Sequence, residues 1–259
     1  MENRKGARKI EEVPADVLLA LNRGDIPTVN LVESLAMNQI ELLQHTLPNR
    51  YHSALLKALT DEGANTYLKQ AKCIGSILCV LAQENNDQTL LPFLINHPSD
   101  TLRCWAAIFI GSKKVEVLDK LQEIKQLAAD QHFGVREIAW IAVREDILNA
   151  PEESIQFLTP WIQSEDENIR RFACESIRPK GVWCRQFKWI QEHPEAVLPI
   201  IDALKDDSAK YVQDSVANWL NDLSKTNPSW VRTITDSWLA DESISKARAY
   251  ICKRATRSL

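Results

Sequence analysis

The stretch Asp166-Glu167-Asn168-Ile169-Arg170, followed by Ala173, decides the fold because its pattern recurs along the chain. A polar start, an apolar residue, a basic or polar residue and then a small residue three positions later also occur in 99–106, 132–139 and 209–216. The residues at the basic position are Lys69, Arg103, Arg136, Arg170, Gln213 and Lys246, at steps of 34, 33, 34, 43 and 33. A repeat of this length with helical spacing inside each unit predicts stacked helix pairs.

The repeat predicts an all-α fold, a single curved solenoid of HEAT-like repeats with its inner helices on the concave side. We expect inner helices near 99–112, 132–146, 166–178 and 208–225. Apolar residues at helical spacing predict partner helices within 115–127, 155–162 and 197–204. Asp166 and Asp207-Ser208 have the chemistry of helix N-caps. The longer step of 43 residues indicates an insertion between about 179 and 192.

Composition limits the class of protein. The chain has 259 residues, of which 45% are hydrophobic and 25% charged, as in an ordinary globular protein. Residues 1–12 are predicted to be a flexible basic arm, and residues 13–259 to form the HEAT-like repeat domain. A net charge of −4 neither favours nor excludes nucleic-acid binding, because what matters is whether basic residues gather on one face.

Several kinds of site and location are not supported by the sequence. The six cysteines form no CxxC pair and no zinc-type spacing, so we expect reduced, buried thiols in a cytosolic protein. The start of the chain lacks a signal peptide, and no apolar run is long enough to cross a membrane. We therefore expect a protein of the bacterial cytosol or nucleoid, without membrane contact. No motif for a nucleotide cofactor or a metal is present, so no cofactor is expected.

The segment 170–183 has the most unusual chemistry. On a helix, Arg171 and Glu175 form an i,i+4 pair, and Arg178 lies three residues further along. Pro179 then ends the helix, and Trp183 follows in a loop. A carboxylate among arginines beside a loop tryptophan is more than packing requires. The alternative is a surface ion pair with packing aromatic residues, which usually contributes little.

Two further helices contain candidate residues. In 136–144, Glu137 adjoins an apolar face and Trp140 lies one turn further; Trp105 and Trp219 recur at similar positions, so packing in the core is the more common explanation. In 211–225 a polar stripe contains two asparagines, which are poor helix formers and indicate buried hydrogen bonds or a ligand. The residues of this stripe are Asn218, Asn221, Asp222 and Lys225.

The recurring arginines also have two explanations. Arg103, Arg136 and Arg170 lie at equivalent positions of successive inner helices. They can pair with the acidic residues Asp100, Asp130 and Asp166, as surface ion pairs commonly do. Alternatively, they face a ligand on the concave side of the solenoid, which is the usual binding surface of this architecture.

The motifs resemble those of a known family. The chain resembles the bacterial DNA alkylation repair proteins of the AlkC/AlkD type, which are HEAT-like-repeat DNA glycosylases. It looks closer to the AlkC branch, and we expect no C-terminal β-domain of the kind that some members carry. Residues 169–183 look like the branch pattern VRR…SEGxRPxxPW, 211–225 like YVxxSVANxLNDxSK, and 132–140 like a variant of the middle repeat. Ser176 stands where the pattern has Gly, and Gly181-Val182 where it has Leu-Pro.

The resemblance implies excision of N-alkylated bases, such as 3-methyladenine, from double-stranded DNA. A carboxylate stabilises the oxocarbenium ion formed at the sugar, and the base need not be flipped out of the helix. The implied catalytic residues are Glu175, Asp222 and Glu137. The DNA contacts expected from the resemblance and from the concave face are Arg171, Trp183, Trp140, Arg178, Arg136 and Lys225. We expect a monomer; the alternative is a non-catalytic HEAT-repeat scaffold that binds DNA structures or protein partners.

Overall fold

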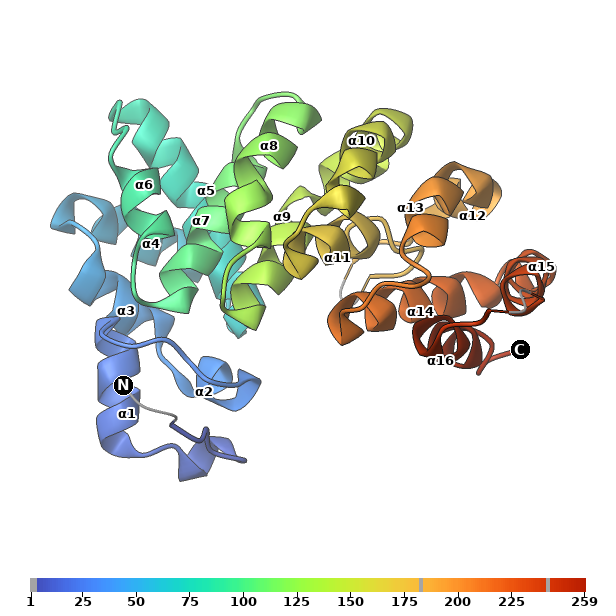
Figure 1. Ribbon diagram of the computed structural model, residues 1–259. Coiled ribbons are helices and arrows are strands. Elements are labelled where there is room, and N and C mark those ends of the chain that lie inside the picture. The colour runs from blue at the N-terminus through green and yellow to red at the C-terminus, as the bar shows by residue number, and fades with distance from the viewer. Residues whose placement is uncertain (1–3, 182–183, 241–242) are drawn as a thin grey trace. The chain divides into compact units, whose positions relative to one another are not determined.

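The computed structural model describes residues 4–181, 184–240 and 243–259 (Figure 1). These ranges contain helices joined by turns and no strand, which confirms the predicted all-α fold. The chain divides into two compact units, residues 1–114 with 131–142 and residues 115–130 with 143–259. Each unit has its own buried residues, and a single domain over 13–259 stays a prediction. No helix in the described ranges is long and apolar enough to cross a membrane.

The first unit begins with short helices and continues with longer ones. Polar side chains start several of them: Asn30, Asn38 and Thr66 each accept a hydrogen bond from a backbone N–H of the first turn. The elements are η1 (Ile10–Glu12), α1 (Ala15–Arg23), α2 (Leu31–Ala36), α3 (Gln39–Thr46), α4 (Asn49–Asp61), α5 (Tyr67–Glu84), α6 (Leu90–Ile95), α7 (Asp100–Ser112) and the first part of α9 (Phe133–Asn149).

The core of the first unit lies between α5 and α7. Gly75 lets these helices approach, since a Cβ there would lie 2.6 Å from the Cβ of Ile108. Trp105 is fully buried, and its Nε1 donates to Oε1 of Gln39 at 2.8 Å. The core explanation of the recurring tryptophans therefore holds for Trp105, because a buried indole needs a partner for its N–H.

Part of the predicted flexible arm makes defined contacts in the structure. Arg4 Nη1 lies 2.5 Å from Oε1 of Glu33, and Asn30 Nδ2 donates to the carbonyl of Ala7 at 2.9 Å. These bonds attach residues 4–7 to the start of α2. The last residues of the arm form the 3₁₀ turn η1.

The second unit contains the remaining helices. Proline occupies the first residue of α10 and of α15, as the fixed φ of proline allows. The insertion indicated by the 43-residue step forms the loop and short helices between α11 and α13. The elements are α8 (Val117–Ala128), the end of α9, α10 (Pro151–Leu158), η2 (Thr159–Gln163), α11 (Glu167–Glu175), α12 (Lys188–Glu192), η3 (Pro194–Val197), α13 (Leu198–Ala203), α14 (Lys210–Ser224), α15 (Pro228–Leu239) and α16 (Lys246–Ala255).

The four predicted inner helices correspond to α7, α9, α11 and α14, but α11 ends three residues early. Pro179 has no N–H to donate to the carbonyl of Glu175, which instead accepts from Arg178 N at 3.3 Å in a tighter turn. Asp166 is the N-cap of α11, as predicted. The N-cap of α14 is Ala209, not Asp207 or Ser208, although Asp207 Oδ1 accepts from the Ala209 N–H.

Four of the six aligned residues, three arginines and Gln213, share one structural role in these helices. Each is the fourth residue of its helix, and its side chain donates to a backbone carbonyl of the preceding loop. The pairs are Arg103 with His97 (2.8 Å), Arg136 with Gln131 (3.0 Å), Arg170 with Ser164 (2.9 Å) and Gln213 with Asp207 (2.7 Å). Lys69 and Lys246 are the third and first residues of α5 and α16, so they fall outside this register.

The cysteines largely follow the prediction of buried thiols. Five are buried, and Cys184 is half-buried in the loop before α12. All six are free thiols, and the described residues contain no group of side chains suited to a metal ion.

Candidate functional site

Glu175, at the end of α11, is the centre of a buried charged cluster in the second unit. Its side chain is 4% exposed. Oε2 accepts from Ser215 Oγ on α14 at 2.6 Å and lies 3.6 Å from Nη2 of Arg171. Oε1 accepts from Nη1 of Arg178 at 2.6 Å. Both carboxylate oxygens are therefore engaged by side chains of α11, its C-terminal turn and α14.

Arg178 joins Glu175 to Asp222. Its Nε and Nη2 donate to Oδ2 of Asp222 on α14 at 3.0 and 2.6 Å. Lys225 Nζ lies 3.4 Å from the other oxygen of Asp222. The structure thus brings five of the predicted residues into one group, hereafter the α11–α14 cluster: Arg171, Glu175, Arg178, Asp222 and Lys225.

Opposite charges keep the central pair ionised. Burial acts to raise the pKa of Glu175, but the positive charges of Arg171 and Arg178 outweigh it, and the net pKa is lowered. For Arg178, burial acts to lower the pKa, and the carboxylates of Glu175 and Asp222 more than reverse this, so the pKa is raised. Glu175 is therefore a carboxylate at neutral pH and not a proton donor.

Asp222 differs from Glu175 in access to solvent. Its side chain is 10% exposed, against 4% for Glu175. Within the described residues, Oδ1 of Asp222 has only the long contact with Lys225, whereas Oδ2 accepts both bonds from Arg178. Of the two carboxylates, Asp222 is the one with an oxygen closer to being available for a ligand.

Arg171 lies on an aromatic side chain. Its guanidinium carbon is 4.1 Å from the ring centroid of Tyr211, the second residue of α14. Such stacking holds a guanidinium in one orientation, which is useful where it must meet a phosphate. Arg171 is 8% exposed, so the expected phosphate contact stays a prediction.

Arg144, which the sequence argument did not assign to the site, supports the cluster from α9. This arginine is 1% exposed and donates to the backbone carbonyls of Ser176 and Arg178. It caps the end of α11, where unpaired carbonyls favour a cation. Burial lowers the pKa of Arg144 to about 10, so it stays protonated at neutral pH. The available signal was an arginine directly after the apolar residues 138–143.

Ser215 was also missed as a site residue. It precedes Asp222 by seven residues, which is two helical turns, so both lie on the same side of α14. That spacing, within a motif already identified, could have paired Ser215 with the cluster. The neighbouring Trp219 is fully buried and donates from Nε1 to the carbonyl of Ile177 at 3.0 Å, so the core explanation holds for it too.

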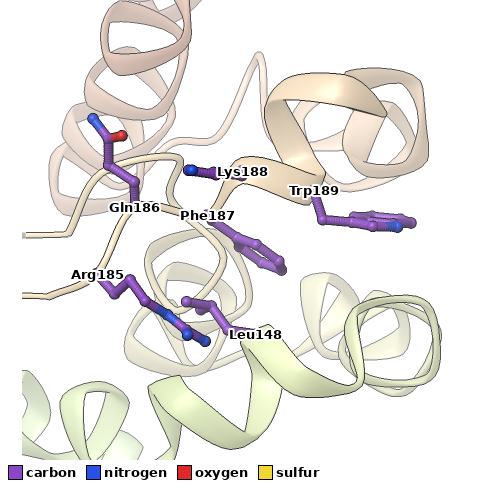
Figure 2. Close-up of a pocket in the computed structure, with 6 residues that line it drawn as sticks. All are labelled: Leu148, Arg185, Gln186, Phe187, Lys188 and Trp189. Atoms are coloured by element: carbon purple, nitrogen blue, oxygen red, sulfur yellow. The ribbon is translucent and has the colours of Figure 1, made fainter.

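A pocket of about 480 Å³ adjoins the loop that follows α11 (Figure 2). Arg185 and Phe187 extend toward the end of α9, where Leu148 lies. The guanidinium of Arg185 is 3.2 Å from the carboxylate of Glu145. The lining residues are Leu148, Arg185, Gln186, Phe187, Lys188 and Trp189. Trp183, the loop tryptophan predicted to contact DNA, lies outside the described residues.

The remaining predicted residues belong to the first unit. Trp140 is 2% exposed, and its Nε1 donates to Oε2 of Glu137 at 2.8 Å. This indole already has an internal partner, which favours the packing explanation that the sequence left open. Arg136 donates to the loop carbonyl of Gln131. Participation of Glu137, Trp140 and Arg136 in the site stays a prediction.

Comparisons with known proteins relate the chain to DNA repair. It is 35% identical over 138 residues to the uncharacterized protein YhaZ of Bacillus subtilis, covering 53% of this chain and 37% of that protein. The structure of Pseudomonas fluorescens alkylpurine DNA glycosylase AlkC, bound to DNA containing an abasic site analog, matches with a TM-score of 0.67 and 25% identity. That match covers 85% of this chain and 62% of AlkC. The chain therefore spans less than two thirds of both proteins.

A second solved structure supports the same fold. AlkD2 from Streptococcus mutans matches with a TM-score of 0.56 and 22% identity, over 85% of this chain and 97% of AlkD2. These likenesses confirm the HEAT-like repeat architecture predicted from the spacing. The family model described as DNA alkylation repair enzyme matches residues 82–251, which include the whole α11–α14 cluster. The chain belongs to the DNA alkylation repair enzyme family.

Proposed function

We propose that this chain is a DNA glycosylase that releases N-alkylated bases from double-stranded DNA. The observation that carries the proposal is the α11–α14 cluster, in which two carboxylates share one guanidinium beside further cations. An N-alkylated purine such as 3-methyladenine is positively charged, so its glycosidic bond is weak. As the bond breaks, its electron pair leaves with the base and positive charge develops on the sugar.

The two carboxylates have different roles in this proposal. Asp222, the more accessible one, stabilises the charge on the sugar and orients the water that adds to C1′. As the water adds to C1′, it gives a proton to the carboxylate of Asp222, and the base departs neutral. Glu175 is a positioning residue, because both of its oxygens are engaged inside the protein and its link to Asp222 is Arg178. Glu137 is proposed as a third carboxylate on the resemblance alone.

DNA binding uses cations around these carboxylates. Arg171 and Lys225 hold phosphates next to the damaged nucleotide, which positions the duplex without reading its sequence. The likeness to AlkC, whose structure contains DNA with an abasic site analog, supports double-stranded DNA as the partner. We propose that the base is released without being flipped into a pocket, and that the protein acts as a monomer in the bacterial cytosol.

The decisive experiment is release of free base from N-methylated duplex DNA, measured in single turnover with excess protein. A glycosylase releases base faster than the spontaneous reaction and leaves an abasic site that alkali converts into a strand break. Unmethylated duplex of the same sequence is the substrate control, and heat-unfolded protein is the enzyme control. Duplex binding with no acceleration of base release would instead favour the non-catalytic scaffold.

A further inference from the structure

The last helix of the chain is strongly basic, although the whole chain has a net charge of −4. Residues 245–259 contain five cationic side chains and no acidic one. Arg248 is buried and bound to Asp206. The other four are exposed or half-buried: Lys246, Lys253, Arg254 and Arg257. We call these four residues the α16 cation face.

This face is incompletely neutralised. Asp214 of α14 lies 3.3 Å from Arg254 but is also 2.8 Å from Lys210, so one carboxylate serves two cations. Arg257 Nη2 donates to Oδ1 of Asn218 at 3.1 Å, which is a neutral partner. Within the residues that the structure describes, Lys246, Lys253 and Arg257 form no ion pair. Charges left in this state attract an anionic partner.

Aromatic contacts hold the cations of α14 and α16 together. Lys210 Nζ lies 3.3 Å from the ring centroid of Tyr250, and Arg254 Nη1 donates to Oη of the same tyrosine at 2.6 Å. Tyr250 Oη in turn donates to Asp214. The ring therefore fixes the register between the two helices and keeps like charges close in the free protein.

The α16 cation face lies beside the α11–α14 cluster. Asn218, which binds Arg257, precedes Asp222 by four residues, so the two side chains lie one turn apart, about 6 Å along α14. One side of α14 contacts the turn that follows α11 through Asp222 and Arg178, and another side contacts α16 through Asn218 and Arg257. Cations therefore stand on both sides of the proposed site: Arg178 on one and Arg257 on the other.

The length of the face suits a nucleic-acid backbone. Lys246 and Lys253 are seven residues apart on α16, roughly 10 Å along the helix axis. Duplex DNA has one negative charge per about 1.7 Å of its axis, so several phosphates can meet a face of this length. A short acidic peptide would also match the charge, but the position one turn from Asp222 favours the DNA that occupies the site.

We propose that the α16 cation face binds backbone phosphates of the duplex whose damaged nucleotide lies at Asp222. This inference rests on the proposed function for the position of the lesion, but its contacts are to phosphates and need no catalysis. Arg254 and Arg257 hold the backbone nearest to the site, and Lys253 and Lys246 extend the contact along α16. The duplex would thus be held from both edges of α14.

The test is the salt dependence of duplex binding by the full chain, with the double variant Lys253→Ala/Arg257→Ala. Each lost phosphate contact lowers the slope of log affinity against log salt by about 0.9, so the double variant should lose about 1.8. Arg232→Ala is the matched control, because Arg232 is an exposed arginine on the neighbouring helix α15. The control should keep the wild-type slope and affinity.

An unchanged slope in the double variant, with wild-type affinity, would overturn the inference and leave the proposed function standing. A loss of about 0.9 in the slope of Arg232→Ala, the same loss per cation removed, would also overturn it, because the binding would then follow net charge and not this face. The opposite pattern is equally clear. If the wild type releases no base but the slope falls as expected only in the double variant, the inference holds and the glycosylase proposal fails. Circular dichroism of each variant confirms that the helices remain folded.

Discussion

Arginine has different roles at the starts of the inner helices and in the α11–α14 cluster. At the fourth residue of α7, α9 and α11 an arginine ties its own helix to the preceding loop, and Gln213 does the same in α14. In the cluster, Arg178 bridges two carboxylates instead. The first arrangement recurs in helix after helix, and the second occurs where α11 is cut short by Pro179.

The difference teaches how to interpret a repeated residue in a solenoid. A contact that every repeat needs is a packing contact, and even a neutral glutamine can replace its arginine. A residue that departs from the repeat has no such explanation and is the better functional candidate. We therefore expect changes in the α11–α14 cluster to affect both catalysis and stability. Changes at the helix starts should affect stability alone.

The largest effect is expected from Asp222→Asn. The change keeps the shape of the side chain and its position beside Arg178. It removes the negative charge of Asp222, which in the proposal faces the sugar. We expect base release in single turnover to slow by about 10²–10³, the scale of losing one electrostatic contributor. Asp236→Asn, on the exposed side of α15, is the control and should behave as wild type. Equal rates for Asp222→Asn and wild type would remove Asp222 from the catalytic site.

Glu175→Gln is the second test and separates positioning from packing. We expect base release to slow by about 10², because Arg178 loses one of its two carboxylates and no longer holds Asp222 in place. Stability should also fall, by about 2 kcal/mol in urea unfolding, because Arg171 and Arg178 stay buried with less counter-charge. Glu167→Gln, at the exposed start of the same helix, is the matched control.

The same variant should change the acid limb of the stability curve. The pKa of Glu175 is lower in the folded protein, so its ion pairs stabilise above the unfolded pKa of about 4.3. This contribution is lost as the pH falls through the lower folded pKa. Glu175→Gln lacks it at every pH, so its unfolding free energy should fall less on acidification than that of wild type. Parallel curves would mean that the pKa of Glu175 is the same in the folded and the unfolded protein.

Much of this arrangement could be predicted from the sequence, because helix periodicity and proline chemistry act locally. The spacing of the aligned residues located four inner helices. Pro179 predicted a helix that continues to Arg178, whereas α11 ends at Glu175. The motif residues around Glu175 and Asp222 indicated the cluster. Neither local pattern nor motif could predict that Arg178 binds Asp222, because that contact depends on the rotamers of two residues that lie 44 positions apart in the chain.

The residues that the sequence missed are those whose partners are backbone atoms or distant side chains. Arg144 binds the carbonyls of Ser176 and Arg178, and a carbonyl leaves no mark in the residue types. The recurring arginines were assigned either to acidic residues of their own repeat or to a ligand. The structure instead pairs Arg170 with Asp207, from the loop before α14, since that loop lies against the start of α11.

Arg170→Ala tests the helix starts directly. The guanidinium donates to both oxygens of Asp207 at 2.6 and 2.9 Å, and to the loop carbonyl of Ser164. Its loss leaves a buried carboxylate with fewer partners, so we expect the free energy of unfolding to fall by about 2–3 kcal/mol. Base release by the folded variant should match wild type. A loss of rate like that of Asp222→Asn would instead place the helix starts in the site and break the comparison.

The smallest effect is expected from Gln213→Ala. This side chain makes one neutral hydrogen bond, from Nε2 to the carbonyl of Asp207 at 2.7 Å, so its loss should cost about 1 kcal/mol in urea unfolding. Gln122→Ala, an exposed glutamine of α8, is the control and should leave stability unchanged.

The position of Gln213 makes the comparison with Arg170 quantitative. Arg170 holds Asp207 by its carboxylate and Gln213 holds it by its carbonyl, so both stabilise the same residue from two helices. The loss of unfolding free energy in the double variant should therefore differ from the sum of the two single losses, by about 0.5 kcal/mol or more. Additive losses would mean that each helix start is tied independently. Coupled losses would mean that Arg170 and Gln213 stabilise the loop before α14 together. The stability of α11 would then depend on a residue of the next repeat.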